Sequence, residues 1–430
     1  MGRHPRLRAL PSPERLRAGR RNACPKHFGK ERHSGVQART MKIAKSYPPP
    51  RRGRIEVGVT MAFSSPHPRP LPPGEREIID VIFYLKSEEE IVMQITMKKY
   101  ANRIEKSQVN PHLRYDGKRS GLILDPQKEK VPLQVLGFGI YQLKSDFITK
   151  NTKDKEMVLV PQDGRFEAEI NGKNFSGERT HGPFFPGPGR SNASALYVPS
   201  NVRLKIRGRG EIAFFEAPAL KEKPPFFLSG EDVKVMSRGD WIWRRDIVPL
   251  ISPKDASSNL VVGETYSPPG FWSGTPLHQH DKDQPQSGES DHEEVYYHRF
   301  NWKKNSGDLI GPYGVQILMD GKRLMKAYLI GEKSIFAIPG GCHPVVASPV
   351  SELLYLWGLA GKGEALAMRD IPEFVHLKSF EEIFKTLKED QKIKNLSKED
   401  FNGICQPYPF TVEQKDLLIA ILREKGCDIA

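Results

Sequence analysis

Cysteine is scarce in this chain, which has four cysteines among 430 residues. Cys24, Cys342, Cys405 and Cys427 are scattered, and no two of them form a Cys-x-x-Cys pair. A disulfide framework or a cysteine-rich structural zinc site needs paired or clustered cysteines. The sequence therefore argues against both, and its cysteine usage fits a reducing compartment.

Long apolar runs are also missing. No stretch of the sequence approaches the roughly 20 apolar residues that a membrane helix needs. The N-terminus is basic but lacks the apolar core of a signal peptide. We therefore expect a cytoplasmic protein without a membrane partner.

Aspartate is absent from the first 75 residues, which hold 17 Lys and Arg against four Glu. This segment thus carries +13 of the total formal charge of +14, and the rest of the chain is nearly neutral. A basic tail can bind nucleic acid without specificity. No recognition motif accompanies the charge, so we expect no specific nucleic-acid partner.

The leading segment is rich in Arg, Pro, Ser and Gly, a composition that cannot bury a core. We predict disorder for residues 1–92 and a lead-in to the folded part over residues 93–131. A basic interaction arm, a transit peptide and upstream sequence translated from an early start codon are the open alternatives. In the last case the segment is not part of the native protein, and Met93 or Met97 would be the native start.

Residues 132–220 read as short strands separated by turns at Gly and Pro. The Asn171-Gly172 pair is the strongest hairpin signal in the chain. Many short strands at regular spacing indicate an all-β barrel or sandwich. This part contains no His-x-His, so we predict an N-terminal barrel without metal.

The rest of the chain divides by composition into three parts. Residues 221–240 are charged and broken by Pro-Pro and Ser-Gly, which indicates a linker. Residues 241–365 return to short strands and form a second predicted barrel. Residues 366–430 show helical periodicity, with Ser397 and Thr411 as predicted N-caps. We expect a helical extension that packs on a barrel or on a second subunit, which leaves a homo-oligomer open.

Four residues of the second predicted barrel have the chemistry of metal ligands. His278 and His280 are two apart, so in a strand they point to one face. Glu294 opens the apolar run VYY, and His343 follows the turn signal Pro-Gly-Gly. A lone His-x-His is common on protein surfaces, but the ordered set of four is far more specific. Three imidazoles and a carboxylate suit Zn, Mn or Fe and leave positions for water or substrate.

Glu294 has two neighbours that could replace it as a ligand, Glu293 and His292. We prefer Glu294 because it alternates with Tyr296 and His298 on one face of the predicted strand. His298 would then lie near the metal without binding it.

The order of these ligands resembles the metal pattern of cupins, whose fold is a small double-sheet β-barrel. The flanking sequences GETYSPPGFWSGTPLHQHD, EEVYYHRF and PGGCHPVVASP resemble the 5-deoxy-glucuronate isomerase family of bacterial inositol catabolism. The resemblance covers roughly residues 132–362. It implies two cupin barrels in tandem, of which the second holds a divalent metal.

The resemblance also implies an activity, the aldose–ketose isomerisation of 5-deoxy-D-glucuronate to 2-deoxy-5-keto-D-gluconate. Such a reaction needs a Lewis acid and a base that moves a proton. Glu293 and His298 are candidates for the base by proximity alone. The substrate is a small-molecule uronate, and its carboxylate needs a cationic partner. The remaining candidates are residues for substrate binding: Arg299, Arg245, Arg190 and Gln316.

Several residues depart from the family pattern and leave the exact substrate open. Phe271 stands where the family has Asn, Cys342 where it has Tyr, and Met325 and Lys326 where it tends to be acidic. Cys342 is either redox-active or simply a small buried residue. An Fe-dependent dioxygenase and a non-enzymatic sugar-binding protein are the alternatives to the isomerase.

Overall fold

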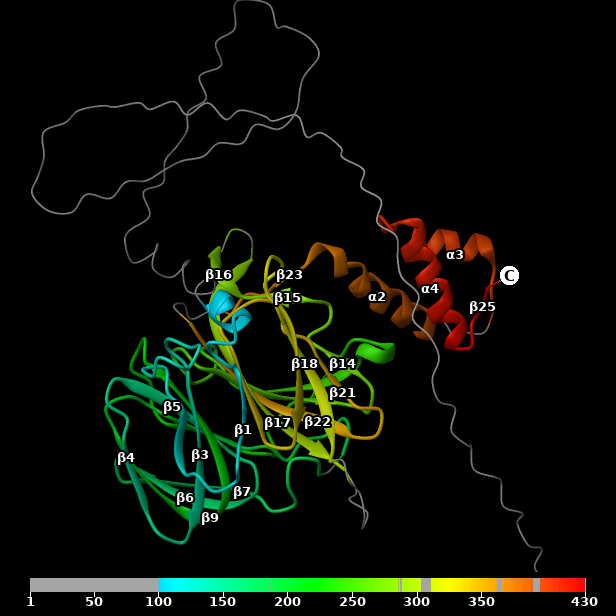
Figure 1. Cartoon of the computed structure of the whole chain (residues 1–430). Helices are drawn as coiled ribbons and strands as arrows, with labels where there is room; N and C mark the ends of the chain where they lie inside the picture. Colours follow the sequence, from blue (N-terminus) through cyan, green and yellow to red (C-terminus); the bar gives the residue numbers. More distant parts are fainter. Residues whose placement is uncertain are drawn as a thin grey trace, which may run out of the picture. The chain divides into compact units, whose positions relative to one another are not determined.

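The computed structural model describes residues 100–429, apart from 186, 285, 287, 303–310, 362–365 and 390–394. All of these belong to one compact unit that spans Ile82–Ala430. The predicted disorder of residues 1–92 and the candidate start sites lie outside the described residues. The described part is mostly β-sheet, with a helical segment at residues 100–105 and further helices at its C-terminal end, in line with the all-β prediction (Figure 1). Within it, every helix is too short or too polar to span a lipid bilayer.

The first sheet is built from the N-terminal half of the described chain. Its main path runs through β10 (Phe226–Leu228), β8 (Ala195–Val198), β5 (Lys155–Pro161), β9 (Arg203–Pro218), β3 (Gly137–Lys144) and β2 (Gly121–Leu124). Off this path, β9 also pairs with β4 (Ile148–Asn151) and β6 (Gly164–Ile170), and β6 pairs with β7 (Lys173–Arg179).

The hairpin between β6 and β7 forms where the sequence predicts it. Ile170 pairs with Lys173, so Asn171 and Gly172 are the two turn residues. Both have positive φ angles, 49° and 78°, which is the backbone that Asn-Gly adopts at low cost. Along β6 the apolar side chains of Phe166, Ala168 and Ile170 are buried and alternate with more exposed charged residues.

The second sheet carries most of the C-terminal half. Its path runs through β1 (His112–Arg114), β20 (Ser334–Ile338), β17 (Glu289–Asn301), β22 (Glu352–Gly361), β13 (Val261–Ser267), β12 (Arg245–Ile251) and β11 (Met236–Arg238), and β16 (Asp281–Gln284) also pairs with β17. The third sheet has the order β14 (Trp272–Ser273), β21 (Val345–Ala347), β18 (Tyr313–Met319) and β19 (Met325–Gly331). Two short pairs complete the strands: β15 (His278–Gln279) with β23 (Arg369–Asp370), and β24 (Asn395–Leu396) with β25 (Asp428–Ile429).

The sheets stay open, so the prediction of two closed barrels is confirmed only as far as the mostly β architecture. Within the described residues, the path of the second sheet ends at β1 on one side and at β11 on the other. The edge at β20 is taken by β1, a strand that comes from the predicted lead-in. Strands β10 and β11 lie in the predicted linker 221–240. The domain boundaries given by the sequence remain predictions.

The two faces of the second sheet have different neighbours. One face packs on the first sheet through an apolar cluster in which Phe138 and Tyr297 lie 5.6 Å apart, centroid to centroid. The opposite face joins an apolar cluster with the third sheet, which includes Tyr296, Tyr355 and Leu318. Adjacent residues of a strand point to opposite faces, so Tyr296 and Tyr297 enter different cores.

The helices follow the strands, as the periodicity of residues 366–430 predicts. They are α2 (His376–Glu389), α3 (Lys398–Cys405) and α4 (Val412–Glu424), with short 3₁₀ turns at Pro372–Phe374 and, earlier in the chain, at Trp241–Trp243. The side chains of Ser397 and Thr411 accept hydrogen bonds at the starts of α3 and α4, which confirms both predicted N-caps. Figure 1 shows α3 and α4 side by side. Trp243 joins their apolar cluster and connects it to the second sheet.

Candidate metal centre

Three of the four predicted ligands converge. The possible ligand atoms of His280, Glu294 and His343 all lie within 4.8 Å of one another, and all three residues are buried. The Nε2 atoms of His280 and His343 are 3.3 and 3.0 Å from Oε2 of Glu294. The residues come from three separate parts of the chain: the loop before β16, the strand β17 and the loop before β21.

Each histidine is oriented by a hydrogen bond from its other ring nitrogen. Nδ1–H donates to a backbone carbonyl in every case: Pro276 for His278 at 3.1 Å, His292 for His280 at 3.0 Å, and Gly341 for His343 at 2.7 Å. This fixes the tautomer in which Nε2 has a free lone pair. Metal-binding histidines in proteins are held in the same way.

His278 lies beside this group without belonging to its tightest cluster. Its ring is 5.7 Å from the His343 ring and 6.4 Å from the His280 ring, centroid to centroid. Burial, with the neighbouring His343 and His280, lowers the pKa of His278 to about 3. The imidazole is therefore neutral near pH 7, as a metal ligand must be.

The electrostatics of the centre also suit a cation. Burial alone would raise the pKa of Glu294, but the adjacent imidazoles of His280 and His343 outweigh it and lower the pKa to about 2. The carboxylate is thus ionised. Nε2 of His343 is buried and contacts Glu294 without the geometry of a hydrogen bond, so it has no such partner among the described residues. A buried nitrogen without a hydrogen-bond partner, beside an ionised carboxylate, is suited to bind a metal ion.

The loops that carry the ligands are tied to each other. The backbone N–H of Gly341 donates to Oδ2 of Asp281 at 2.7 Å, so the residue after His280 holds the turn before His343. Gly340 has a φ of 145°, and a Cβ there would lie 2.6 Å from Cβ of Asp281. This close approach requires glycine. The Pro-Gly-Gly signal of the sequence is therefore a packing requirement of the centre.

A cavity of about 340 Å³ opens beside the ligands. His278, His280 and Glu294 lie in its wall, together with aromatic and hydroxyl side chains of the second and third sheets. These side chains are Tyr296, Tyr355, Trp357, Thr265 and Ser273. Oγ of Ser273 and the Tyr355 hydroxyl lie 2.6 Å apart, and Trp357 Nε1–H donates to Thr265 Oγ1 at 3.0 Å. The cavity has the mixed apolar and polar lining of a small-molecule site.

Arg245 is the predicted substrate-binding arginine that lines this cavity. Arg238, which the sequence did not single out, lines it as well. Arg299 lies on the opposite face of the second sheet, where Nε donates to Glu332 Oε1 at 2.7 Å. Arg190 is exposed and does not line the cavity.

Glu293 lies on the face of β17 opposite to Glu294. Its carboxylate accepts hydrogen bonds from three consecutive backbone N–H groups, those of Gln134, Val135 and Leu136, at 2.6, 2.9 and 3.2 Å. This position ties the chain before β3 to the second sheet. Glu293 was chosen as a base for its nearness in sequence, but the alternation of the strand turns it away from the cavity.

His298 and Gln316 are fully buried behind the ligands rather than in the cavity wall. Nδ1–H of His298 donates to the Ser334 carbonyl at 3.0 Å, and its Nε2 is 3.3 Å from Oε1 of Gln316. Nε2–H of Gln316 donates to the carbonyls of His343 at 2.8 Å and Pro344 at 3.2 Å. These residues therefore support the loop of His343.

Cys342, next to His343, is buried, and burial raises the pKa of its thiol to about 11. The thiol is then protonated at neutral pH and is a weak nucleophile. This placement favours the small buried residue over the redox-active cysteine.

The sequence reasoning missed the aromatic wall and Arg238. Tyr296 shares the predicted alternation with Glu294, so its place beside the ligands could be anticipated. Tyr355 and Trp357 come from β22, which reaches the cavity because it pairs with β17. No local signal in the sequence marks that pairing.

Comparison with known proteins gives a consistent result. A family model described as the KduI/IolB family matches residues 111–377. The 5-deoxy-glucuronate isomerase of Geobacillus kaustophilus is 28% identical over 244 residues, which are 56% of this chain and 85% of that protein. The enzyme of the same name from Bacillus subtilis strain 168 is 25% identical over 216 residues, or 50% of this chain and 76% of that protein.

A solved structure shares the fold. The crystal structure of an IolB-like protein from Salmonella typhimurium LT2 superposes with a TM-score of 0.56 and 24% sequence identity. The match covers 63% of this chain and 100% of that one. The family match ends within α2, so α3 and α4 lie beyond it.

Proposed function

Because the chain belongs to the KduI/IolB family, we propose that it is a metal-dependent aldose–ketose isomerase, an intramolecular oxidoreductase of inositol catabolism. The proposed substrate is 5-deoxy-D-glucuronate, or a closely related uronate, and the product is 2-deoxy-5-keto-D-gluconate. The relatives that carry the name 5-deoxy-glucuronate isomerase support this reaction. The observation that carries the proposal is the convergence of His280, Glu294 and His343 beside a cavity of substrate size.

The proposed metal ligands are His278, His280, Glu294 and His343. The buried Nε2 of His343, the ionised Glu294 and the three Nδ1–H bonds to carbonyls fit a divalent ion such as Zn, Mn or Fe. When bound, such an ion supplies a Lewis acid for a carbonyl and its neighbouring hydroxyl. We place this centre in the second of two cupin-like modules, with the first module free of metal.

The chain's own side chains orient the substrate and stabilise its charge. Burial raises the pKa of both Tyr296 and Tyr355, so both hydroxyls stay protonated in the cavity. They can donate hydrogen bonds to the oxygen that gains negative charge as the enediol forms. Trp357 offers an apolar surface to the carbon chain, and Arg245 offers a guanidinium to the carboxylate.

The direct test is turnover of 5-deoxy-D-glucuronate followed by NMR, with protein loaded in turn with Zn, Mn, Fe and Co. We expect formation of the keto product with at least one metal. The Glu294→Gln variant should bind metal more than about 100-fold more weakly, since loss of even an outer-shell partner costs 10–100-fold. Glu167→Gln is the matched control, because the Glu167 side chain is 63% exposed and lies on the first sheet. Absence of turnover with all four metals would rule out this assignment.

A further inference from the structure

Arg238 and Arg245 face each other across a pair of strands that ends at the cavity. The two residues are directly opposite partners in the antiparallel pairing of β11 with β12. Directly opposite residues point to the same face of a sheet. Both side chains line the same cavity as Glu294 and Tyr296. The strand pair therefore presents two guanidinium groups to one space.

Neither guanidinium is neutralised within the described part of the chain. Arg238 donates only to the Ser237 carbonyl at 3.4 Å and to the sulfur of Met236 at 3.8 Å. Arg245 donates to the Trp243 carbonyl at 3.3 Å. No carboxylate of the described residues lies within 4.0 Å of either guanidinium, as an ion pair would require. Burial lowers the pKa of Arg245, and Arg238 adds to this effect, although Glu381 acts against it.

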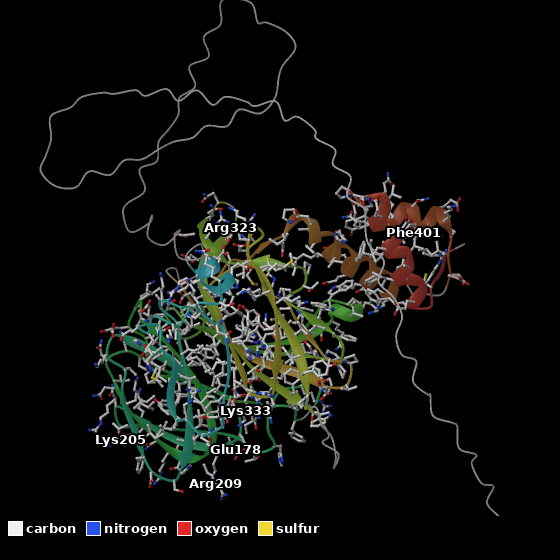
Figure 2. The ribbon with its side chains drawn as sticks, viewed as in Figure 1. Glu178, Lys205, Arg209, Arg323, Lys333 and Phe401 are labelled. Carbon is white, nitrogen blue, oxygen red and sulfur yellow. The ribbon has the colours of Figure 1, made fainter. Side chains whose placement is uncertain are left out.

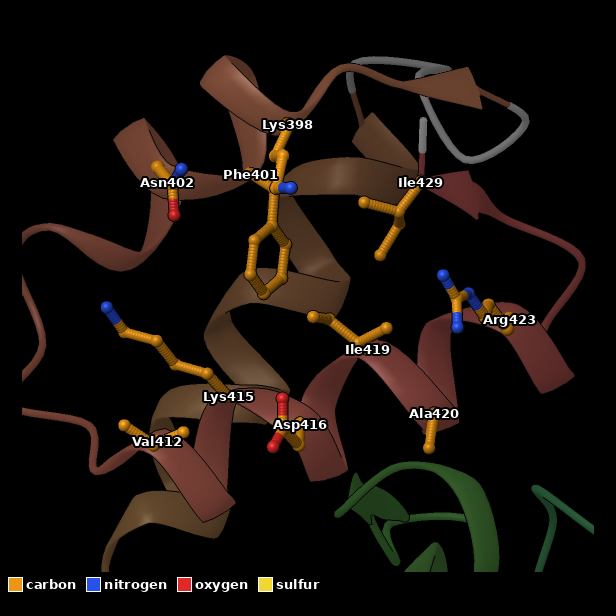
Figure 3. A pocket seen from close by; sticks show the side chains of 10 residues that line it. All are labelled: Lys398, Phe401, Asn402, Val412, Lys415, Asp416, Ile419, Ala420, Arg423 and Ile429. Atoms are coloured by element: carbon orange, nitrogen blue, oxygen red, sulfur yellow. The ribbon is translucent and has the colours of Figure 1, made fainter.

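Two other buried arginines of the described chain have acidic partners, since Arg179 pairs with Glu264 and Arg299 pairs with Glu332. Arg165 and Arg209 of the first sheet also stand opposite each other, but both are exposed to water. The hollow on α3 and α4, of about 620 Å³, has both an acidic residue and basic residues in its wall (Figure 3). Arg245 is only partly exposed and shares its cavity with Arg238, and like charges directly opposite each other are destabilising. This favours a negatively charged ligand between them.

The arginine pair and the metal ligands lie at different places on the second sheet. Glu294 on β17 and Arg245 on β12 are separated by β22 and β13. The pairing of the four strands also puts Arg245 near the level of Phe300, about six residues along β17 from Glu294. One cavity joins the two places, because Arg238, Arg245 and Glu294 all lie in its wall.

We propose that Arg238 and Arg245 together form a carboxylate clamp that makes the site select acids over neutral sugars. The inference rests on the proposed function and extends it by assigning Arg238 to specificity. The uronate proposed as substrate carries its carboxylate at the end away from the aldehyde. Two forked guanidinium groups can bind both oxygens of that carboxylate.

The test compares an acid with its neutral counterpart. We would measure kcat and KM of wild-type, Arg238→Gln and Arg238→Lys proteins with 5-deoxy-D-glucuronate and with 5-deoxy-D-glucose, which has a hydroxymethyl group in place of the carboxylate. A hydrogen bond to a charged group contributes about 1.5–3 kcal/mol, so Arg238→Gln should raise KM for the acid about 10–100-fold. Its kcat for the acid and both constants for the neutral sugar should change little. Arg238→Lys should recover part of the loss.

Arg323→Gln is the matched control, because Arg323 is an exposed arginine of the β18–β19 turn (Figure 2) and its loss changes the net charge equally. Equal losses on acid and neutral sugar in Arg238→Gln, or no loss on the acid, would overturn the clamp. A calorimetric titration with D-glucuronate and D-glucose separates this inference from the proposed function. If wild-type protein turns over no substrate but binds D-glucuronate in preference to D-glucose, and Arg238→Gln removes that preference, then the clamp stands and the isomerase assignment fails. No preference in the wild-type protein would contradict the clamp directly.

Discussion

Single side chains hold the candidate metal ligands in place through the backbone of their loops. Gln316 is the clearest case, because its Nε2–H donates to the carbonyls of His343 and Pro344 and its side chain is fully buried. Replacing it by leucine leaves the His343 carbonyl without this donor, at a cost of about 1–3 kcal/mol, whereas the Pro344 carbonyl keeps the backbone N–H of Ile317. The effect should be local, because these bonds act on the residues that position the His343 ring.

We therefore expect Gln316→Leu to weaken metal binding about 10–100-fold, as loss of an outer-shell partner does. The measurement is competition with a chelator of known affinity. Gln142→Leu is a suitable control, because the Gln142 amide donates to Tyr115 and Glu211, away from the metal ligands. Equal metal affinities of the two variants would show that Gln316 has no role in supporting the ligand loop.

The three predicted ligands that lie together share one property, which is local geometry. His280 and Glu294 follow from strand alternation, and His343 follows from a turn with two glycines whose φ angles are positive. The base candidates were chosen by distance along the chain instead. Glu293 is next to Glu294 in sequence but lies on the opposite face, since a step of one residue on a strand reverses the face of the sheet. Nearness in sequence is therefore a poor guide to a site built on strands.

Among the elements, the strand pair β11–β12 was the least visible in the sequence. β11 has three residues, which is too short for a periodicity to emerge, and its charged neighbours gave residues 221–240 the composition of a linker. Arg238 reaches the cavity only because β11 pairs with β12. Such a contact depends on tertiary pairing, which composition and local pattern do not encode.

The turn of this strand pair is also where the C-terminal helices attach. Asp240 precedes the 3₁₀ turn and pairs with Lys388 of α2 at 2.9 Å and with Lys425, after α4, at 2.5 Å. Trp243 Nε1–H donates to Glu381 of α2 at 2.7 Å. Helices that lie largely beyond the family match are thus bonded to the turn between Arg238 and Arg245.

The attachment through Asp240 predicts that the stability of the folded protein depends on pH. Burial alone would raise the pKa of Asp240, but hydrogen bonds from Lys425 and Lys388 outweigh it and lower the pKa below its usual 3.8. A carboxylate with a depressed pKa stabilises the folded state fully above its unfolded pKa, and this contribution is lost as the pH falls through the folded pKa. Asp240→Asn should thus be less stable than wild type at pH 7, and the difference should shrink as the pH falls below 3.8 towards the lowered folded pKa.

Urea unfolding of wild type and Asp240→Asn at a series of pH values measures this difference. Using the difference between the two proteins removes the contribution of other carboxyl groups that titrate in the same range. Asp255→Asn serves as a control, since Asp255 is exposed and bonds only to Ser252 within its own turn. A stability difference that stays constant from pH 7 to pH 3 would mean that the lysine pairs do not stabilise the helices.

For the molecule as a whole, the two large sheets are joined by more than apolar contact. Glu156 of β5 accepts hydrogen bonds from the backbone N–H groups of Ser258, Asn259 and Leu260, just before β13, at 2.6–2.8 Å. Arg179 at the end of β7 forms two hydrogen bonds with Glu264 of β13, at 2.6 and 2.8 Å. Both carboxylates are buried, so each bond is made where water does not compete. We infer that the two sheets unfold together.

Breaking the Arg179–Glu264 pair tests this coupling. Both side chains are 1% exposed, and removal of one partner leaves the other as an unpaired buried charge. Arg179→Met should therefore lower the free energy of unfolding by about 3–5 kcal/mol, whereas the double variant Arg179→Met with Glu264→Met should recover much of it. Arg207→Met, in an exposed pair with Glu167, should cost at most about 1 kcal/mol.

The number of urea-unfolding transitions tests the coupling of the two sheets as directly as the midpoint does. Far-UV circular dichroism follows the strands, and tryptophan fluorescence follows the second sheet and the helices, because all five tryptophans lie beyond residue 240. Because Glu156 and the apolar cluster also join the sheets, urea unfolding of Arg179→Met should remain a single transition that both signals report at the same lower urea concentration. Two separated transitions in the variant would mean that each sheet system is stable alone and that the buried ion pair is what makes them one cooperative unit. A single transition with an unchanged midpoint would instead mean that the ion pair does not stabilise the contact between the two sheets. Their apolar cluster, where Phe138 packs against Tyr297, would then hold them together.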